Sequence, residues 1–199
     1  MDTVFVGIDP GELKGGVGIV DQAGRYLLAE RWNRKNPRQT FKILQTYREQ
    51  IKAVYLEDVN LPQKGALGNQ HSSGSNLLIN SGIWQGWLIA LNIPYVLVHP
   101  LTWQALSGLT RWQAKLKKNP NALTPLIRAR EFWPAAPLQF LADDGKAVGL
   151  LLADMARRDN LQGIDRQAIR DTNHEKAQLK RKNLRQAKKA QNSLASDMG

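Results

Sequence analysis

Short apolar runs separated by turn residues dominate the first third of the chain. The run at residues 4–8 is apolar apart from one glycine, which is typical of a buried strand, and a second apolar run follows Gly15. The glycine at position 24 marks a turn before a third run. The pattern predicts three consecutive strands, over residues 1–8, 15–21 and 25–32.

The rest of the chain alternates between helical and strand-like periodicity. Apolar positions spaced three and four residues apart indicate helices, and short β-rich runs indicate strands. Helices are predicted over residues 37–50, 75–91, 121–132 (with Asn121 as its cap) and 143–158, and strands over 52–59 and 94–98. Residues 60–75 have no periodicity and predict a long exposed loop. Strands that alternate with helices indicate an α/β fold.

Two acidic residues stand at the ends of predicted strands. Asp9 follows the first apolar run, and Glu57 ends the apolar stretch "VYLE". If these strands are parallel neighbours, their carboxyl ends lie about 4.8 Å apart, so both carboxylates could share one cation. Taken alone, Asp9 is more simply explained as a turn acid before Pro10 and Gly11, whereas a Glu on a buried strand needs a partner.

Oxygen ligands of this kind favour a hard cation such as Mg²⁺ or Mn²⁺. The chain contains no cysteine, so thiolate metal sites and disulfides are excluded, and its three histidines have no metal-ligand spacing. Carboxylates held close together repel one another unless a cation neutralises them. Such a site can hydrolyse phosphodiester bonds by activating water and stabilising the leaving oxygen.

The charge balance points to a polyanionic partner. The chain has a formal net charge of +11, which favours nucleic acid first and a membrane surface second. Every charged residue between positions 176 and 189 is Lys or Arg. The expected organisation is a domain over residues 1–159 followed by a basic, weakly packed tail over 160–199. The tail could bind DNA or be a solvated end.

The N-terminus does not resemble a signal peptide, because no charged region precedes its apolar run. No apolar stretch approaches the roughly 18 residues that a membrane span needs. The expectation is an intracellular protein, cytoplasmic or nucleoid-associated, with no membrane partner.

Five blocks in a fixed order resemble the RuvC-type Holliday junction resolvases of the ribonuclease H-like superfamily, and in particular their phage-like and organelle-like branch. The blocks extend over roughly residues 3–155. They are "VGIDPG", "VYLEDV", "NLLINSGIWQGWLIALNIPYVLVHPLTWQ", "ALTPLIRAREFWP" and "DDGKAVGLLLA". The ordered set is much more specific than any single block.

This resemblance implies a ribonuclease H-like α/β fold with a five-stranded mixed sheet of strand order 3-2-1-4-5. It implies that Asp9, Glu57 and Asp144 are catalytic metal ligands for Mg²⁺ or Mn²⁺, with Asp143 able to complete the site. It also implies a homodimer that nicks two strands of a four-way DNA junction symmetrically. The loop at 60–75 and the basic stretch near 115–118 would face the junction. The predicted DNA contacts are Lys64, His71, Ser72, Ser73, Arg111, Trp112, Lys115, Lys117, Lys118 and Lys146.

The last block departs from the family pattern at one position. Val148 stands where the family has a second acid, one helical turn after Asp144, and Gly149 stands where alanine is usual. The alternative function is therefore a branched-DNA-binding protein whose catalysis is weakened or lost. The first block also resembles the phosphate loop of sugar kinases and actin-like ATPases, but those folds need a longer chain and a second loop.

Two further features concern packing. Four tryptophans lie in apolar surroundings and are expected in the core: Trp84, Trp87, Trp103 and Trp133. Trp112, which lies between Arg111 and Lys115, could equally contact nucleic acid or pack on the surface. Gly82 and Gly86, four residues apart, predict a flat helix face that another element can approach closely.

Overall fold

The computed structural model describes residues 2–11, 15–32, 35–59, 71–109 and 123–162. The chain divides into two units, Met1–Gly163 and Ile164–Gly199, and all described residues lie in the first. The basic tail predicted over 160–199 therefore falls almost entirely outside the described residues. None of the helices in the described ranges has the length and apolar character that crossing a membrane requires.

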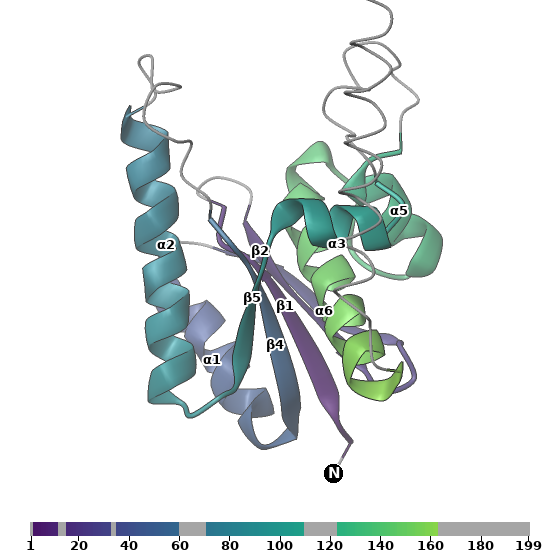
Figure 1. Ribbon diagram of the computed structural model, residues 1–199, viewed down its shortest axis with the longest axis horizontal. Helices are drawn as coiled ribbons and strands as arrows, with labels where there is room; N and C mark the ends of the chain where they lie inside the picture. Colours follow the sequence, from purple (N-terminus) through teal and green to yellow (C-terminus); the bar gives the residue numbers. More distant parts are fainter. Residues whose placement is uncertain (1, 12–14, 33–34, 60–70, 110–122, 163–199) are drawn as a thin grey trace, which may run out of the picture. The chain divides into compact units, whose positions relative to one another are not determined.

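The centre of the fold is a five-stranded mixed sheet of order β3-β2-β1-β4-β5, which confirms the predicted order (Figure 1). The three N-terminal strands form an antiparallel meander, and β4 and β5 run parallel to β1. The strands are β1 Val4–Asp9, β2 Gly16–Asp21, β3 Tyr26–Arg31, β4 Ile51–Glu57 and β5 Tyr95–Val98.

Helices cover both faces of the sheet. Figure 1 shows α1 and α2 on one side and α3, α5 and α6 on the other. The α-helices are α1 Pro37–Tyr47, α2 His71–Ala90, α3 Pro100–Leu106, α5 Pro125–Phe132 and α6 Asp144–Gln162, with short 3-10 turns at Arg48–Gln50 and Leu141–Asp143. Strands buried on both faces read as continuous apolar runs, which explains the pattern at the start of the sequence.

The core on the side of α1 and α2 is aliphatic and aromatic. Alternate residues of β1 and β4 pack there against Leu44, Trp84 and Leu88. Trp32 contacts Trp84 with ring centroids 5.1 Å apart. The predicted core positions of the tryptophans are confirmed: Trp84, Trp103 and Trp133 are buried, and Trp87 is partly buried against the core.

Helix α6 lies directly on the backbone of the central strands. A Cβ atom on Gly7 would lie 2.0 Å from the carbonyl oxygen of Gly149, and one on Gly18 would lie 2.3 Å from the amide nitrogen of Leu150. A side chain at any of these glycines would force the helix away from the sheet. This close approach gives a physical reason for Gly149, and it fixes where α6 begins relative to β1 and β2.

Several predicted boundaries are wrong by about one turn. Helix α2 begins at His71, so residues 71–75 are helical rather than part of a loop. Helix α3 begins at Pro100, directly after the predicted strand over 94–98, because proline fits the first turn of a helix. The next helix begins at Pro125, with the Thr124 hydroxyl, not Asn121, as its N-cap, and α6 extends four residues beyond the predicted end.

Candidate active site

The two strand-end acids meet at one edge of the sheet. Asp9 is the last residue of β1 and Glu57 is the last residue of β4, and these strands are parallel neighbours with Ile8 opposite Leu56. Asp144 is the first residue of α6. The next residue, Gly145, packs against Gly16, which pairs with Asp9 across the β-ladder. Three separate segments thus bring acids to the same edge.

The carboxylates act on one another electrostatically. Burial holds the pKa of Asp9 well above its ordinary value, and the charge of Glu57 raises it further. A hydrogen bond from Gly11 acts in the opposite direction, and the charge of Asp144 makes a smaller contribution that raises the pKa. Burial also raises the pKa of Glu57, and the charge of Asp144 adds to this. Within the described part of the chain, no Lys or Arg forms an ion pair with Asp9 or Glu57. The carboxylates of Asp9 and Glu57 therefore face other negative charge rather than a basic side chain of the described residues.

The turn after β1 is tied to helix α2. Asp9 Oδ1 accepts a hydrogen bond from the Gly11 amide at 2.8 Å, so Asp9 is a turn acid as well as a member of the acidic group. A carboxylate has a second oxygen, and the two interpretations are compatible. Asn80, which is fully buried on α2, donates from Nδ2 to the carbonyl of Pro10 at 3.2 Å. This contact is not predictable from the sequence, because Asn80 lies in an otherwise helical pattern.

Glu57 is held from helix α3. The indole Nε1 of Trp103 donates a hydrogen bond to Glu57 Oε1 at 2.9 Å, and this bond lowers the pKa of Glu57 against the larger effect of burial. Trp103 was predicted only as a core residue. The available signal was its position three residues after Pro100, because a proline that begins a helix fixes where the fourth residue lies.

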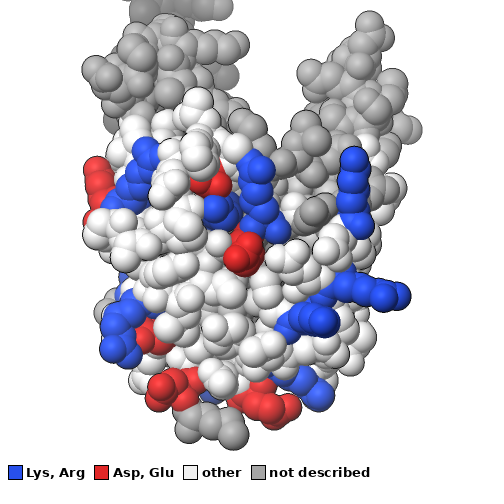
Figure 2. Space-filling view, turned by 180° about the vertical axis from the view of Figure 1, so that it is seen from behind, with Lys and Arg blue, Asp and Glu red and all other residues white. Residues whose placement is uncertain are grey.

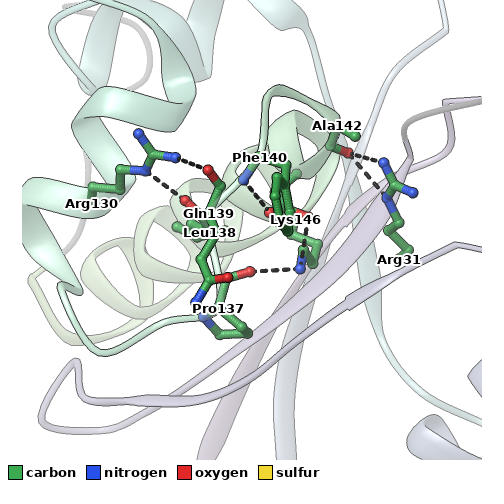
Figure 3. Close-up of polar contacts among 9 residues, drawn as sticks. Arg31, Arg130, Pro137, Leu138, Gln139, Phe140, Ala142 and Lys146 are labelled. Atoms are coloured by element: carbon green, nitrogen blue, oxygen red, sulfur yellow. Dashed lines mark hydrogen bonds and ion pairs between the residues drawn. The ribbon is translucent and has the colours of Figure 1, made fainter.

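Asp143 and Lys146 stabilise the segment before α6. Asp143 Oδ1 forms an ion pair with Lys146 Nζ at 2.8 Å, and its Oδ2 accepts from the Phe140 amide at 2.9 Å. Lys146 also donates to the Pro137 carbonyl at 2.6 Å (Figure 3). Burial alone would raise the pKa of Asp143, but the hydrogen bonds from Lys146 and Phe140 outweigh it and lower the pKa. Among the described contacts, none links Asp143 or Lys146 to Asp9 or Glu57.

Two arginines add to this segment's rigidity. Arg31 donates from Nε and Nη2 to the Ala142 carbonyl at 3.1 and 2.7 Å. Arg130 donates to the carbonyls of Leu138 and Gln139 (Figure 3). Basic side chains therefore fix the backbone just before Asp144, and the predicted roles of Asp143 as a ligand and Lys146 as a DNA contact stay predictions.

The donor set was compared with what a metal ion needs. All three acids of the group supply oxygen, and their mutual repulsion is the electrostatic condition that a divalent cation relieves. In the described ranges, however, no three or more His, Cys, Asp or Glu side chains are arranged to hold an ion. Asp9, Glu57 and Asp144 fit a cation by charge and ligand type without converging as three direct ligands.

Val148 lies one turn after Asp144 on α6 and is 5% exposed. Its side chain is apolar and buried, so it cannot supply the oxygen that an acid would supply at this position. Asp154, a further acid on α6, forms ion pairs with Arg157 and Arg158 instead of joining the acidic group.

Most predicted DNA contacts fall outside the described residues: Lys64, Arg111, Trp112, Lys115, Lys117 and Lys118. The backbone of His71, Ser72 and Ser73 forms the first turn of α2 rather than a loop. On the face drawn in Figure 2, basic and acidic side chains are interspersed rather than gathered into one continuous patch. The described part of that face therefore gives no separate electrostatic footprint for DNA.

Comparison with solved structures decides the fold. RuvC from T. thermophilus in complex with a Holliday junction substrate matches with a TM-score of 0.53 and 16% identity, over 81% of this chain and 98% of that one. The chain has a RuvC-type resolvase fold. A second Thermus thermophilus RuvC structure matches with a TM-score of 0.47 and 18% identity, over 78% of this chain and 96% of that one.

The RuvC-type fold accounts for the five-stranded mixed sheet and the helices that flank it. No family model matches the chain, and no curated protein matches it in sequence. At this low identity the structural likeness carries the fold alone, so activity has to be argued from the acids themselves.

Proposed function

We propose that this RuvC-type chain is a divalent-metal-dependent, structure-selective endonuclease that resolves Holliday junctions or other branched DNA by symmetric nicking. The observation that carries the proposal is the group formed by Asp9, Glu57 and Asp144, in which burial and mutual repulsion raise the pKa of Asp9 and Glu57. Carboxylates whose pKa values are perturbed by burial and by one another are candidates for catalytic groups. The RuvC-type fold and the net charge of +11 support branched DNA as the substrate.

In this proposal Mg²⁺ or Mn²⁺ would lie at the edge of the sheet, with Asp9, Glu57 and Asp144 as its oxygen ligands, directly or through bound water. The bound ion supplies positive charge that stabilises the developing negative charge on a phosphodiester and helps to activate water. The chain's own part is to hold the carboxylates in place. The Gly11 amide fixes Asp9, and the position of α6 against Gly16 fixes Asp144. A rigid arrangement matters because small displacements of catalytic groups are costly in rate.

The direct test uses a synthetic four-way junction labelled on each strand. Wild-type protein is incubated with it in Mg²⁺, in Mn²⁺ and in a chelator, beside linear duplex of the same sequence. Paired nicks at symmetric positions, only on the junction and only with metal, are expected. Tight junction binding without nicks in either metal would contradict the catalytic half of the proposal.

The second candidate, a branched-DNA-binding protein with weakened or no catalysis, is favoured by two observations. Val148 offers no oxygen ligand, and no three-ligand metal cluster forms among the described residues. Under this alternative, Val148→Asp restores or raises cleavage by about tenfold or more. Val148→Asn, of similar size but uncharged, is the matched control, and circular dichroism shows whether both variants are folded. Efficient cleavage by wild type would rule the alternative out.

Homodimerisation, which symmetric nicking needs, is supported by the outer face of α2. This helix contains no Asp, Glu, Lys or Arg, and a helix of that kind is normally covered on all sides. Ile79 and Ile89 are 47% and 67% exposed, and no atom lies within 4 Å of a Cβ position on Gly82 or Gly86. The two glycines thus form the open, flat face expected from the sequence.

Light scattering on size-exclusion peaks tests the dimer. Gly86→Lys on the open face of α2 is expected to shift the protein to monomer at micromolar concentration while leaving the helical signal unchanged. Lys42→Gln on α1, away from this face, is the control for a charge change. A Gly86→Lys protein that stays dimeric would show that α2 is not the interface.

A further inference from the structure

We propose that Trp103 is a positioning residue that fixes the orientation of Glu57 through its indole N–H. The proposal rests on the catalytic role proposed for Glu57 and adds a group that acts on it. Trp103 is 2% exposed, and its Nε1 lies 2.9 Å from Glu57 Oε1. The residue reaches the catalytic edge from α3, 46 residues away in sequence.

The path of the chain explains how this contact is made. Val98, the last residue of β5, lies opposite Glu57 in the parallel ladder. The chain then turns at His99, whose Nδ1 accepts a hydrogen bond from the Leu101 amide, and α3 begins at Pro100. One helical turn later the backbone brings Trp103 back over Glu57. The Trp103 carbonyl accepts from the Ser107 amide at 3.0 Å, which anchors the residue within its helix.

The indole hydrogen bond of Trp103 differs from those of the other buried tryptophans. In the described structure, the indole nitrogens of the buried residues Trp32 and Trp84 have no hydrogen-bond partner. Trp133 donates to a backbone carbonyl, that of Gly24, at 2.9 Å. Trp103 donates to a carboxylate. Among the indoles of these four buried tryptophans, that of Trp103 is directed at an acidic side chain.

An indole N–H suits this task chemically. It is a donor only, it carries no charge, and it does not titrate, so it cannot compete with Glu57 for a cation or a proton. Hydrogen bonds to an ionised acceptor are about twice as strong as neutral ones. A single bond to Oε1 therefore fixes the rotation of the carboxylate while the second oxygen remains available for other contacts.

The test compares Trp103→Phe with Trp133→Phe. Both variants keep an aromatic ring in a buried position and both lose one indole hydrogen bond, but Trp133 bonds at the Gly24 turn, at the opposite end of β2 from Asp9. Single-turnover junction cleavage is expected to fall by about tenfold to a hundredfold in Trp103→Phe and by less than about twofold in Trp133→Phe. Junction affinity without divalent metal is expected to be unchanged in both.

A rate loss in Trp103→Phe that is no larger than in Trp133→Phe would overturn the proposal. Equilibrium unfolding of both variants checks that a loss of stability does not produce the difference. A fall in junction affinity equal to the fall in rate would also contradict a positioning role.

A second readout does not depend on cleavage. Each of the six tryptophans gives one indole ¹⁵N–¹H signal, and the two Phe variants assign the signals of Trp103 and Trp133. Glu57→Gln, and separately Mg²⁺ added to wild type, are expected to move the Trp103 signal and to leave the Trp133 signal in place. If wild type cuts no junction but the Trp103 signal responds, the proposed function fails while the link to Glu57 stands. If that signal responds to neither change, the inference about Trp103 fails.

Discussion

The acids of this chain fall into two regions with opposite surroundings. Asp9 and Glu57, at the carboxyl edge of the sheet, have raised pKa values because of burial and neighbouring carboxylates. Asp154, farther along α6, lies between Arg157 and Arg158 at 2.7 and 3.0 Å. Asp21 is also paired: burial would raise its pKa, but hydrogen bonds and the charge of Arg25 lower it.

The difference separates acids paired with basic side chains from acids that face other carboxylates. A buried carboxylate with a basic partner contributes stability, and removing it leaves an unpaired cation. Like-charged carboxylates without a partner cost stability, and the fold retains them only where surrounding structure forces them together. In this chain the parallel pairing of β1 with β4 brings Asp9 and Glu57 together, and the packing of α6 on Gly16 brings Asp144 to the same edge.

Asp9→Asn should give the largest effect on activity. The substitution keeps the side-chain volume and the oxygen that accepts from Gly11 but removes the charge. Junction cleavage is expected to fall on the order of a thousandfold or more, because a catalytic ligand is lost. Gel-shift affinity for the junction should persist, and the unfolding midpoint without metal should be unchanged or higher, because repulsion with Glu57 is relieved. A clearly lower midpoint would mean that Asp9 is a structural acid.

Asp154→Asn is the matched substitution in the paired region. Both arginines lose their partner, and their side chains are largely buried, as is that of Asp154. The free energy of unfolding in urea is expected to fall by about 1–3 kcal/mol, below the roughly 3–5 kcal/mol for breaking a fully buried pair, because the two arginines are partly exposed. Cleavage per folded molecule should stay within about twofold of wild type. A large loss of cleavage would place Asp154 in the site after all.

The acid edge was predictable because it depends on strand period and strand order alone. The carboxyl ends of adjacent parallel strands must lie together, and the continuous apolar runs before Asp9 and Glu57 mark those ends. Asp143 and Asp144 were harder to tell apart. They are neighbours in sequence, but the 3-10 turn before α6 directs Asp143 to Lys146, whereas Asp144 begins the helix beside Gly16.

Contacts that depend on side-chain direction could not be predicted. The sequence pattern places Trp103 in the core and Asn80 within a helix. The register of β4 with β5 brings the Trp103 N–H to Glu57. The position of α2 brings the Asn80 amide to the Pro10 carbonyl. The start of α2 was missed for a related reason. Residues 71–75 contain Ser and Gly, whose local preference favours a turn, and tertiary packing overrides such preferences.

The smallest expected effect is a difference in how stability depends on pH, measured by urea unfolding between about pH 3 and 7 without divalent ions. An acid whose pKa is raised in the folded state binds more protons folded than unfolded. Asp9 and Glu57 should therefore make stability fall as pH rises from their ordinary values, 3.8 and 4.5, through their folded pKa values.

Asp21 and Asp143 have lowered pKa values and should act in the opposite direction. Their contribution is complete above about pH 4 and is lost as pH falls through their folded pKa values. Asp9→Asn should therefore reduce the loss of stability that occurs as pH rises above about 4 and leave the profile below that pH unchanged. Asp21→Asn should reduce the loss that occurs as pH falls below about 4 and leave the profile above that pH unchanged. If both variants changed the pH profile of stability over the same pH range, the two groups of acids would not have pKa values shifted in opposite directions.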